Sequence, residues 1–182
     1  MPDNEFGYTT WGKDWVRLAE PLRLTKPEPL LPRARSIARN NGVRTELEGT
    51  IVRAHIHRGT EASITHLELT PLPRTTIEAL ARIVPGDTLV LGDDLHAAVL
   101  AAGLSVAPIL AATDCSCRAR SPRCLHVLAT CYAVVRLIDE NPWLALDLQG
   151  YRNTPPDMDD TTPTSIPRWT PLEVLDAATY FG

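Results

Sequence analysis

Lysine is almost absent from this 182-residue chain, where Lys13 and Lys26 are the only two lysines among 18 basic residues. Arginine supplies the remaining sixteen, and the chain also holds 16 prolines. Such a composition is typical of a GC-rich coding sequence, which says nothing of function. The formal net charge is −4, which argues against a protein that coats nucleic acid over its whole surface.

Long apolar stretches are also missing. The longest candidate, residues 97–112, is interrupted by Gly103 and Pro108, and a membrane-spanning helix needs about 20 consecutive apolar residues. The first five residues, Met-Pro-Asp-Asn-Glu, are polar and acidic, unlike a secretory leader. We therefore expect a cytoplasmic protein that does not enter the membrane.

Recognisable catalytic motifs are absent as well. The sequence has no glycine-rich phosphate loop, no nucleophile elbow and no paired helical carboxylates beside a histidine. The adjacent Asp93 and Asp94 follow a turn residue and precede a helical stretch, a position typical of helix capping and helix-dipole stabilisation. We expect no enzymatic activity.

Cysteine is scarce but concentrated. Three of the four cysteines and one of the five histidines fall within thirteen residues, with the spacing Cys115-x-Cys117, six residues, then Cys124-x-His126. Three thiols and one imidazole form a tetrahedral ligand set for Zn²⁺. The loop between the two halves contains Pro122 and three arginines, so it has little apolar surface to bury. The spacing predicts a structural zinc site that holds this loop in shape.

Other uses of these cysteines are weaker hypotheses. Cys115 and Cys117 are too close in sequence for a comfortable disulfide, and no secretory leader precedes them. A redox pair normally has the spacing Cys-x-x-Cys, which the chain lacks. A buried core position conflicts with the three arginines of the loop, which indicate exposure: Arg118, Arg120 and Arg123.

Cys131 is the remaining cysteine. It follows Cys124 by seven residues on an apolar stretch, which favours a small core hydrophobe. As a ligand it would have to replace His126.

A zinc enzyme, with water in place of His126 or one cysteine, is a third hypothesis that no nearby general base supports.

The periodicity predicts an α+β fold: a small antiparallel sheet or hairpin with helices, plus a strand-loop-helix zinc finger. The longest predicted helix spans residues 125–138. Further segments are a short helix capped by Thr9 or Thr10, extended stretches at 43–57, 63–69, 88–91 and 106–112, and helices from Thr75 or Thr76 to Val84 and over 95–102. Prolines from Pro21 to Pro32 predict irregular structure between those positions.

Two pairs of side chains have alternative interpretations. Trp11 and Trp15 share one helix face, which suits a binding patch or, more simply, a helix docked on the core. His55 and His57 share one strand face. They could contribute to a second metal site, but without an accompanying cysteine or carboxylate pair an exposed strand face is the better interpretation.

Three regions follow from composition: an N-terminal α+β region at 1–113, the finger with its following helices at 114–152, and a Pro/Asp-rich linker with a C-terminal docking segment at 153–182. Residues 22–58 hold eight basic residues against three glutamates. Residues 114–136 hold four arginines against one aspartate, and residues 153–182 hold one arginine against five acids.

The spacing Cys-x-Cys-x₆-Cys-x-His resembles that of the bacterial SWIM-type zinc finger proteins. The likeness extends over most of residues 6–152, through the segments Phe6–Trp15, Leu31–Arg35, Asp114–Cys117, Cys124–Ala129, Asp139–Leu144 and Leu148–Gly150. It implies a Zn²⁺-dependent module that binds DNA or a protein, such as a helicase-like remodelling ATPase; the predicted partners are thus DNA or, as another nucleic acid, RNA, or a protein.

The residues themselves leave two modes of binding open. Arg118, Arg120 and Arg123 could contact the phosphates of a nucleic acid. Alternatively, the acidic C-terminal region, with aromatic residues among positions 169–182, could make the protein an adaptor that binds another protein without touching nucleic acid.

Overall fold

The computed structural model describes residues 5–22, 28–59, 61–119 and 121–152. These residues form an α+β fold with a small antiparallel sheet, as expected. The strands are β1 (Val43–Glu48), β2 (Ile51–Arg58), β3 (Glu61–Leu69) and β4 (Leu110–Cys115). The helices are α1 (Thr10–Ala19), α2 (Leu31–Arg39), α3 (Arg74–Ile83), α4 (Asp93–Ala101), α5 (Leu125–Glu140) and α6 (Leu144–Asp147).

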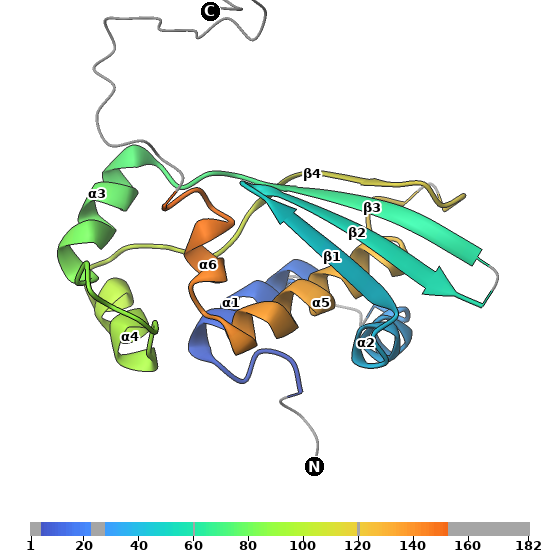
Figure 1. Cartoon of the computed structure of the whole chain (residues 1–182), viewed down its shortest axis with the longest axis horizontal. Helices are drawn as coiled ribbons and strands as arrows, with labels where there is room; N and C mark the ends of the chain where they lie inside the picture. The colour runs from blue at the N-terminus through green and yellow to red at the C-terminus, as the bar shows by residue number, and fades with distance from the viewer. Residues whose placement is uncertain (1–4, 23–27, 60, 120, 153–182) are drawn as a thin grey trace, which may run out of the picture.

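The sheet is a four-stranded meander in the order β1-β2-β3-β4, with every neighbouring pair antiparallel. The alternation expected for a half-buried strand is present in β2, where Val52, Ala54 and Ile56 are buried while Arg53 and His57 are exposed. The helices α1, α2 and α5 lie beneath one face of the sheet, whereas α3 and α4 lie beyond one end of it (Figure 1).

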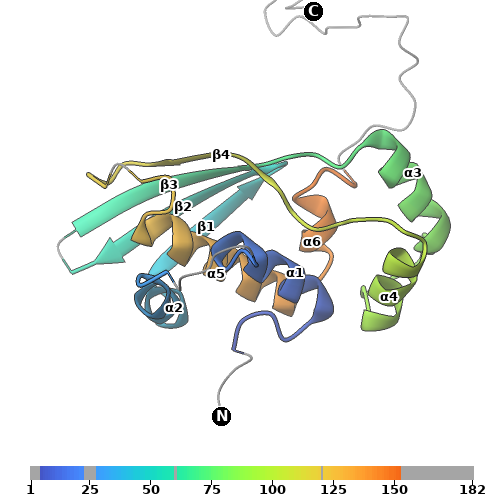
Figure 2. The same ribbon diagram turned by 180° about the vertical axis from the view of Figure 1, so that it is seen from behind.

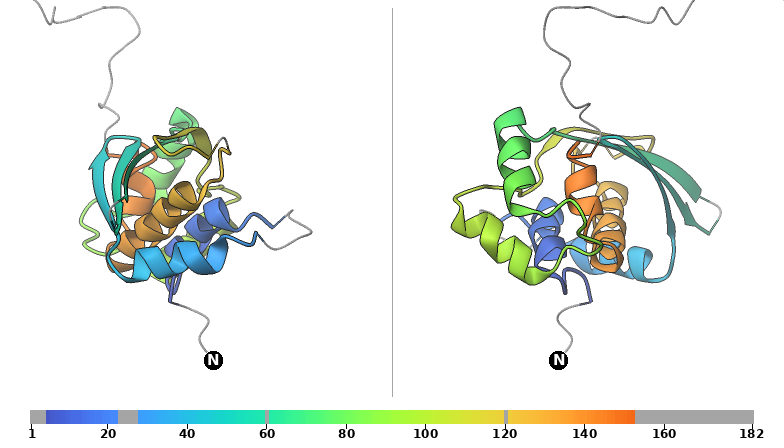
Figure 3. Two further views of the ribbon diagram at one scale, coloured as in Figure 1. Left: turned by 90° about the vertical axis from the view of Figure 1, so that its right-hand side faces the viewer. Right: turned by 60° about the vertical axis from the view of Figure 1, so that its left-hand side comes forward.

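Helix α5 is the centre of the molecule. It lies between the sheet and the pair α1 and α2, an arrangement visible from behind and from the side (Figures 2 and 3). Its buried side chains include Leu128, Tyr132, Val135 and Ile138, all fully enclosed. The stripe of apolar residues predicted for this helix therefore forms the middle layer of the core.

The two tryptophans of α1 dock this helix on the core rather than forming a binding patch. Thr9 caps it by accepting a hydrogen bond from the Gly12 amide at 2.9 Å. Trp11 and Trp15 are each only 1% exposed. The carboxylate of buried Asp139, near the end of α5, accepts hydrogen bonds from the amides of residues 7 and 9 and from the Thr9 hydroxyl.

Three local predictions were wrong. The stretch 43–57 is not one extended segment, because Gly49 adopts a positive φ of 58° and reverses the chain between β1 and β2. The irregular structure predicted from Pro21 to Pro32 ends earlier, because α2 begins at Leu31 and contains Pro32 in its first turn. A proline there loses no helical hydrogen bond, because the first amides of a helix have no partner within it. Residues 88–91 do not form a strand, and the chain bends at residues 89 and 90.

The boundary expected after residue 113 lies within β4, and both 5–113 and 114–152 contribute side chains to one hydrophobic core. The predicted linker and docking segment at 153–182 lie outside the described residues. In the part of the chain that the structure describes, no helix has the length and apolar character that crossing a membrane requires.

Candidate metal centre

The four predicted donors come together from three consecutive elements. Cys115 ends β4, Cys117 lies in the following loop, Cys124 is the N-cap of α5, and His126 is in the first turn of that helix. One donor atom from each lies within 4.8 Å of the other three. These residues form a cluster that could hold a metal ion.

The separations suit a small tetrahedral ion. The Cys115 Sγ atom lies 3.7 Å from Nδ1 of His126. Zinc bonds to sulfur and to imidazole nitrogen place two such donors about 3.6 Å apart in a tetrahedral site. A further contact holds the first thiol, since the Thr65 hydroxyl on β3 donates to Cys115 Sγ at 3.6 Å. The donor set is thus close to the spacing that coordination requires.

Ser116, between Cys115 and Cys117, is hydrogen-bonded to the neighbouring strand β3. Ser116 continues the pairing of β4 with β3, because its amide donates to the Ile64 carbonyl at 2.9 Å and its hydroxyl accepts from the Ile64 amide at 2.9 Å. β4 ends at Cys115, and residues 116–118 form bends. The serine between the cysteines therefore anchors the start of the loop to β3.

Cys124 has a structural role even without an ion. Its sulfur accepts a hydrogen bond from the Val127 amide at 3.5 Å, so it caps α5. Burial raises the pKa of this thiol to about 12. A cation bound at the cluster would favour the thiolate instead, and the positive end of the helix dipole lies at the same place.

Cys117 is in a different environment. Its burial tends to raise the thiol pKa, but hydrogen bonding with the Ala119 backbone and with Cys115 and Cys124 outweighs this effect and lowers the pKa. The sulfur also lies 4.0 Å from the Ala119 carbonyl oxygen. The cluster therefore combines one deeply placed thiol with a partly exposed one that ionises more readily.

The three loop arginines do not form one surface. Arg118 is exposed, whereas Arg120 lies outside the described residues. Arg123 turns inward, and its guanidinium donates to the Leu18 carbonyl at 3.1 Å and to the Ala19 carbonyl at 2.6 Å. These carbonyls end α1, so Arg123 caps that helix. The loop sequence did not indicate this contact, because Arg123 and Ala19 are 104 residues apart in the chain.

The remaining candidates lie apart from the cluster. Cys131 is buried in the core, as expected, and burial raises its pKa to about 12. His55 is half-buried and His57 exposed on the outer face of β2. Among the described residues, no second group of three or more histidine, cysteine or acidic side chains is placed to hold a metal.

Sequence reasoning missed the residues that support the donors. Thr65 and Ser116 lack any pattern that marks them, because their roles depend on the pairing of β3 with β4. No family model matches this chain, and no curated protein or solved structure matches it either. What the cluster can do follows from its own donors, spacing and surroundings.

Proposed function

We propose that this chain is a structural-zinc binding module of the SWIM type, in which Cys115, Cys117, Cys124 and His126 hold Zn²⁺. The observation that carries the proposal is the convergence of these four donors within 4.8 Å. Thiolate and imidazole are the ligands that zinc prefers in structural sites, whereas magnesium and calcium prefer oxygen.

The role proposed for zinc is structural rather than catalytic. Four protein donors fill a tetrahedral coordination shell, so water has no position at which the ion could activate it. The metal would join the end of β4 to the start of α5, across a loop with little apolar surface. This arrangement supports a binding module and not an enzyme.

A nucleic acid is the partner that the loop suits best. Arg118 is exposed beside the cluster, and arginine binds phosphate oxygens through paired, charge-assisted hydrogen bonds. Arg120 belongs to the same loop, and its position lies outside the described residues. Arg123 contributes by fixing the loop on α1, since its guanidinium is used there.

The proposal is tested in two steps on the full chain. Metal analysis of purified protein should find one zinc per chain, and C117S and H126A should each lose it. Electrophoretic binding assays with DNA and RNA should then show salt-sensitive binding that R118A/R120A reduces without loss of zinc. The exposed, charge-matched variant R33A/R82A serves as the control. Substoichiometric metal would contradict the zinc site. Undiminished nucleic-acid binding by R118A/R120A would contradict the role of the loop arginines.

A protein adaptor is the alternative, acting through the acidic and aromatic C-terminal region. Residues 169–182 lie outside the described residues, so this hypothesis depends on composition alone. A pull-down that survives nuclease treatment and is lost when residues 169–182 are deleted would favour the adaptor over the nucleic-acid module.

A further inference from the structure

A cavity of about 560 Å³ lies beside α1 and α2 and contains none of the metal-cluster residues. Phe6, Val16 and Leu22 supply its accessible apolar lining, and the fully buried Tyr132 ring supports the Phe6 ring, with 5.0 Å between the two centroids. The volume is within the range of about 300–1,000 Å³ that is usual for small-molecule sites. An apolar or aromatic group of a ligand would find a matching surface here.

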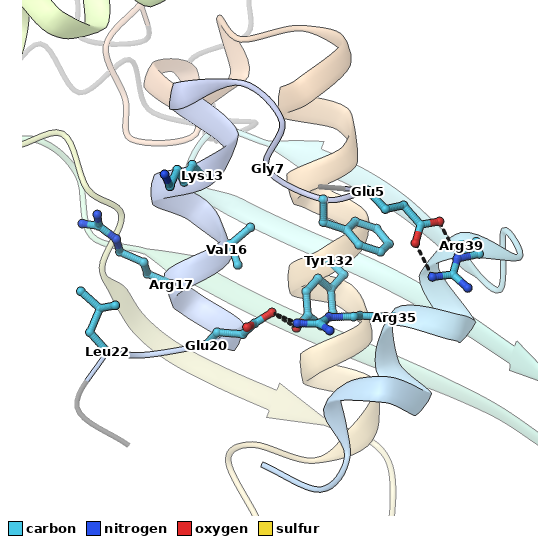
Figure 4. Close-up of a pocket in the computed structure, with 11 residues that line it drawn as sticks. Glu5, Gly7, Lys13, Val16, Arg17, Glu20, Leu22, Arg35, Arg39 and Tyr132 are labelled. Carbon is cyan, nitrogen blue, oxygen red and sulfur yellow. Dashed lines mark hydrogen bonds and ion pairs between the residues drawn. The ribbon is translucent and has the colours of Figure 1, made fainter. Parts of the chain in front are cut away.

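Positive charge dominates the polar lining. Lys13 and Arg17 are one turn apart on α1, and Arg35 and Arg39 are one turn apart on α2 (Figure 4). Among the described residues, the carboxylates that line the same cavity are those of Glu5 and Glu20. The described residues of the lining therefore carry two positive charges in excess, although the whole chain has a net charge of −4.

The inner part of this charged lining is fixed. The Glu20 carboxylate accepts from the Arg35 guanidinium and from the Tyr132 hydroxyl, and Arg35 Nε also donates to that hydroxyl at 3.1 Å. Hydrogen bonding to Glu20 raises the pKa of Arg35. Because these three side chains satisfy one another, they form the rigid wall of the cavity rather than its exchangeable part.

The outer part is exchangeable. Arg39 binds Glu5 through Nε and Nη2, one to each carboxylate oxygen, and a phosphate offers the same two-oxygen geometry to an arginine. The pair is exposed, at 57% for Arg39 and 39% for Glu5, and such surface pairs contribute little to stability. Helix α1 adds two further positive charges to the lining: Lys13, for which no partner is found among the described residues, and Arg17, which pairs with Asp14 at 3.4 Å.

We propose that this cavity binds a small phosphate ester whose phosphate takes the place of the Glu5 carboxylate on Arg39. The organic part of the ester lies against Phe6 and Val16, which are half-buried. A phosphate dianion balances the two excess positive charges of the lining, which a monocarboxylate cannot do. Glu5 is then a built-in competitor that occupies the arginine until the phosphate arrives.

The experiment is calorimetric titration of the full-length, zinc-loaded protein with phenyl phosphate, compared with inorganic phosphate, benzoate and phenol. We expect phenyl phosphate to bind most tightly and phenol least. R39A should weaken phenyl phosphate binding at least about tenfold, since it removes a two-point charge-assisted contact. K13A/R17A should weaken it about threefold through the lost positive field, and E5Q should tighten it about threefold by freeing Arg39.

The exposed variant R33A/R82A provides the control, because it removes two arginines that do not line the cavity. It should leave phenyl phosphate affinity unchanged. Equal affinity for benzoate, unchanged binding by R39A, or no binding of either phosphate at millimolar concentration overturns the proposal. So does duplex DNA that binds through Arg39 while phenyl phosphate does not. Zinc content is measured for every variant, so a failure here is distinguishable from a failure of the zinc module.

Discussion

The two ends of α5 are held by different chemistry. At its start, Cys124 and His126 meet thiols from the preceding strand and loop, with an exposed arginine beside them. At its other end, the buried Asp139 carboxylate accepts hydrogen bonds from the amides of residues 7 and 9 and from the Thr9 hydroxyl, just before α1 begins. The second contact is complete with protein groups alone. The first brings together groups that a metal ion would join, so ion removal and mutation should affect the two ends separately.

Removal of the zinc proposed for the cluster should have the largest effect, and only at the start of α5. Structural zinc binds small finger domains with apparent free energies of about 10–16 kcal/mol. Chelation, or C117S, should therefore abolish hydrogen-exchange protection over residues 113–126. Residues 128–138 should keep it, because their side chains are buried between the sheet and α1 and α2.

C131A is the matched control for C117S, since it removes a buried thiol outside the cluster. It should retain one zinc per chain and protection over 113–126. Loss of zinc from C131A, or full zinc content in C117S, would show that the ligand set has been assigned incorrectly.

The carboxylate at the other end should come next in size. D139A removes the acceptor of three hydrogen bonds to residues 7 and 9. Leaving buried donors unsatisfied costs about 1–3 kcal/mol each, and we expect a loss of about 3 kcal/mol in unfolding free energy by denaturant titration. E140Q alters the adjacent exposed carboxylate and should change stability by less than about 0.5 kcal/mol. Zinc content should be unchanged in both, and a D139A protein as stable as E140Q would contradict this account.

Gly12 offers a sharper test of the same contact. A Cβ atom at this position would lie 2.1 Å from Oδ1 of Asp139 and 3.0 Å from the Thr9 hydroxyl oxygen. The carboxylate cannot move aside without giving up its hydrogen bonds, so G12A should cost about 1–3 kcal/mol despite the better helix propensity of alanine.

A double-mutant cycle measures whether this cost passes through the carboxylate. G12A should be less destabilising in the D139A background than in the wild type, because the clashing oxygen is then absent. Additive effects would instead mean that Gly12 is required for another reason.

The smallest expected effect is at Arg123, which connects the loop between Cys117 and Cys124 to α1. R123A loses hydrogen bonds to the Leu18 and Ala19 carbonyls. It should therefore reduce the unfolding free energy by about 1–2 kcal/mol. R123K should recover part of this loss. R118A, which removes an exposed arginine of the same loop, should stay within about 0.5 kcal/mol of the wild type. Equal effects of R118A and R123A would contradict the capping role.

The donors and the docking of α1 were accessible to prediction for different reasons. Cys115 and His126 are eleven residues apart, so local spacing was enough to bring their atoms together. The apolar period of α5 and the burial of Trp11 and Trp15 followed from helical geometry. Asp139 carried no such signal, because its partners lie about 130 residues away. The direction of Arg123 was equally hidden, since a loop arginine looks the same in sequence whether it faces solvent or a helix end.

The sequence by itself determined the donor set, the α+β character of the chain and the central apolar helix, because each depends on residues that are neighbours along the chain. Only the tertiary structure decided which charged groups form hydrogen bonds within the protein. Arg123 and Asp139 bind the two ends of α1, and the basic residues of α1 and α2 line one cavity. Those outcomes depend on how distant helices pack, and packing is a property of the assembled core rather than of any local stretch.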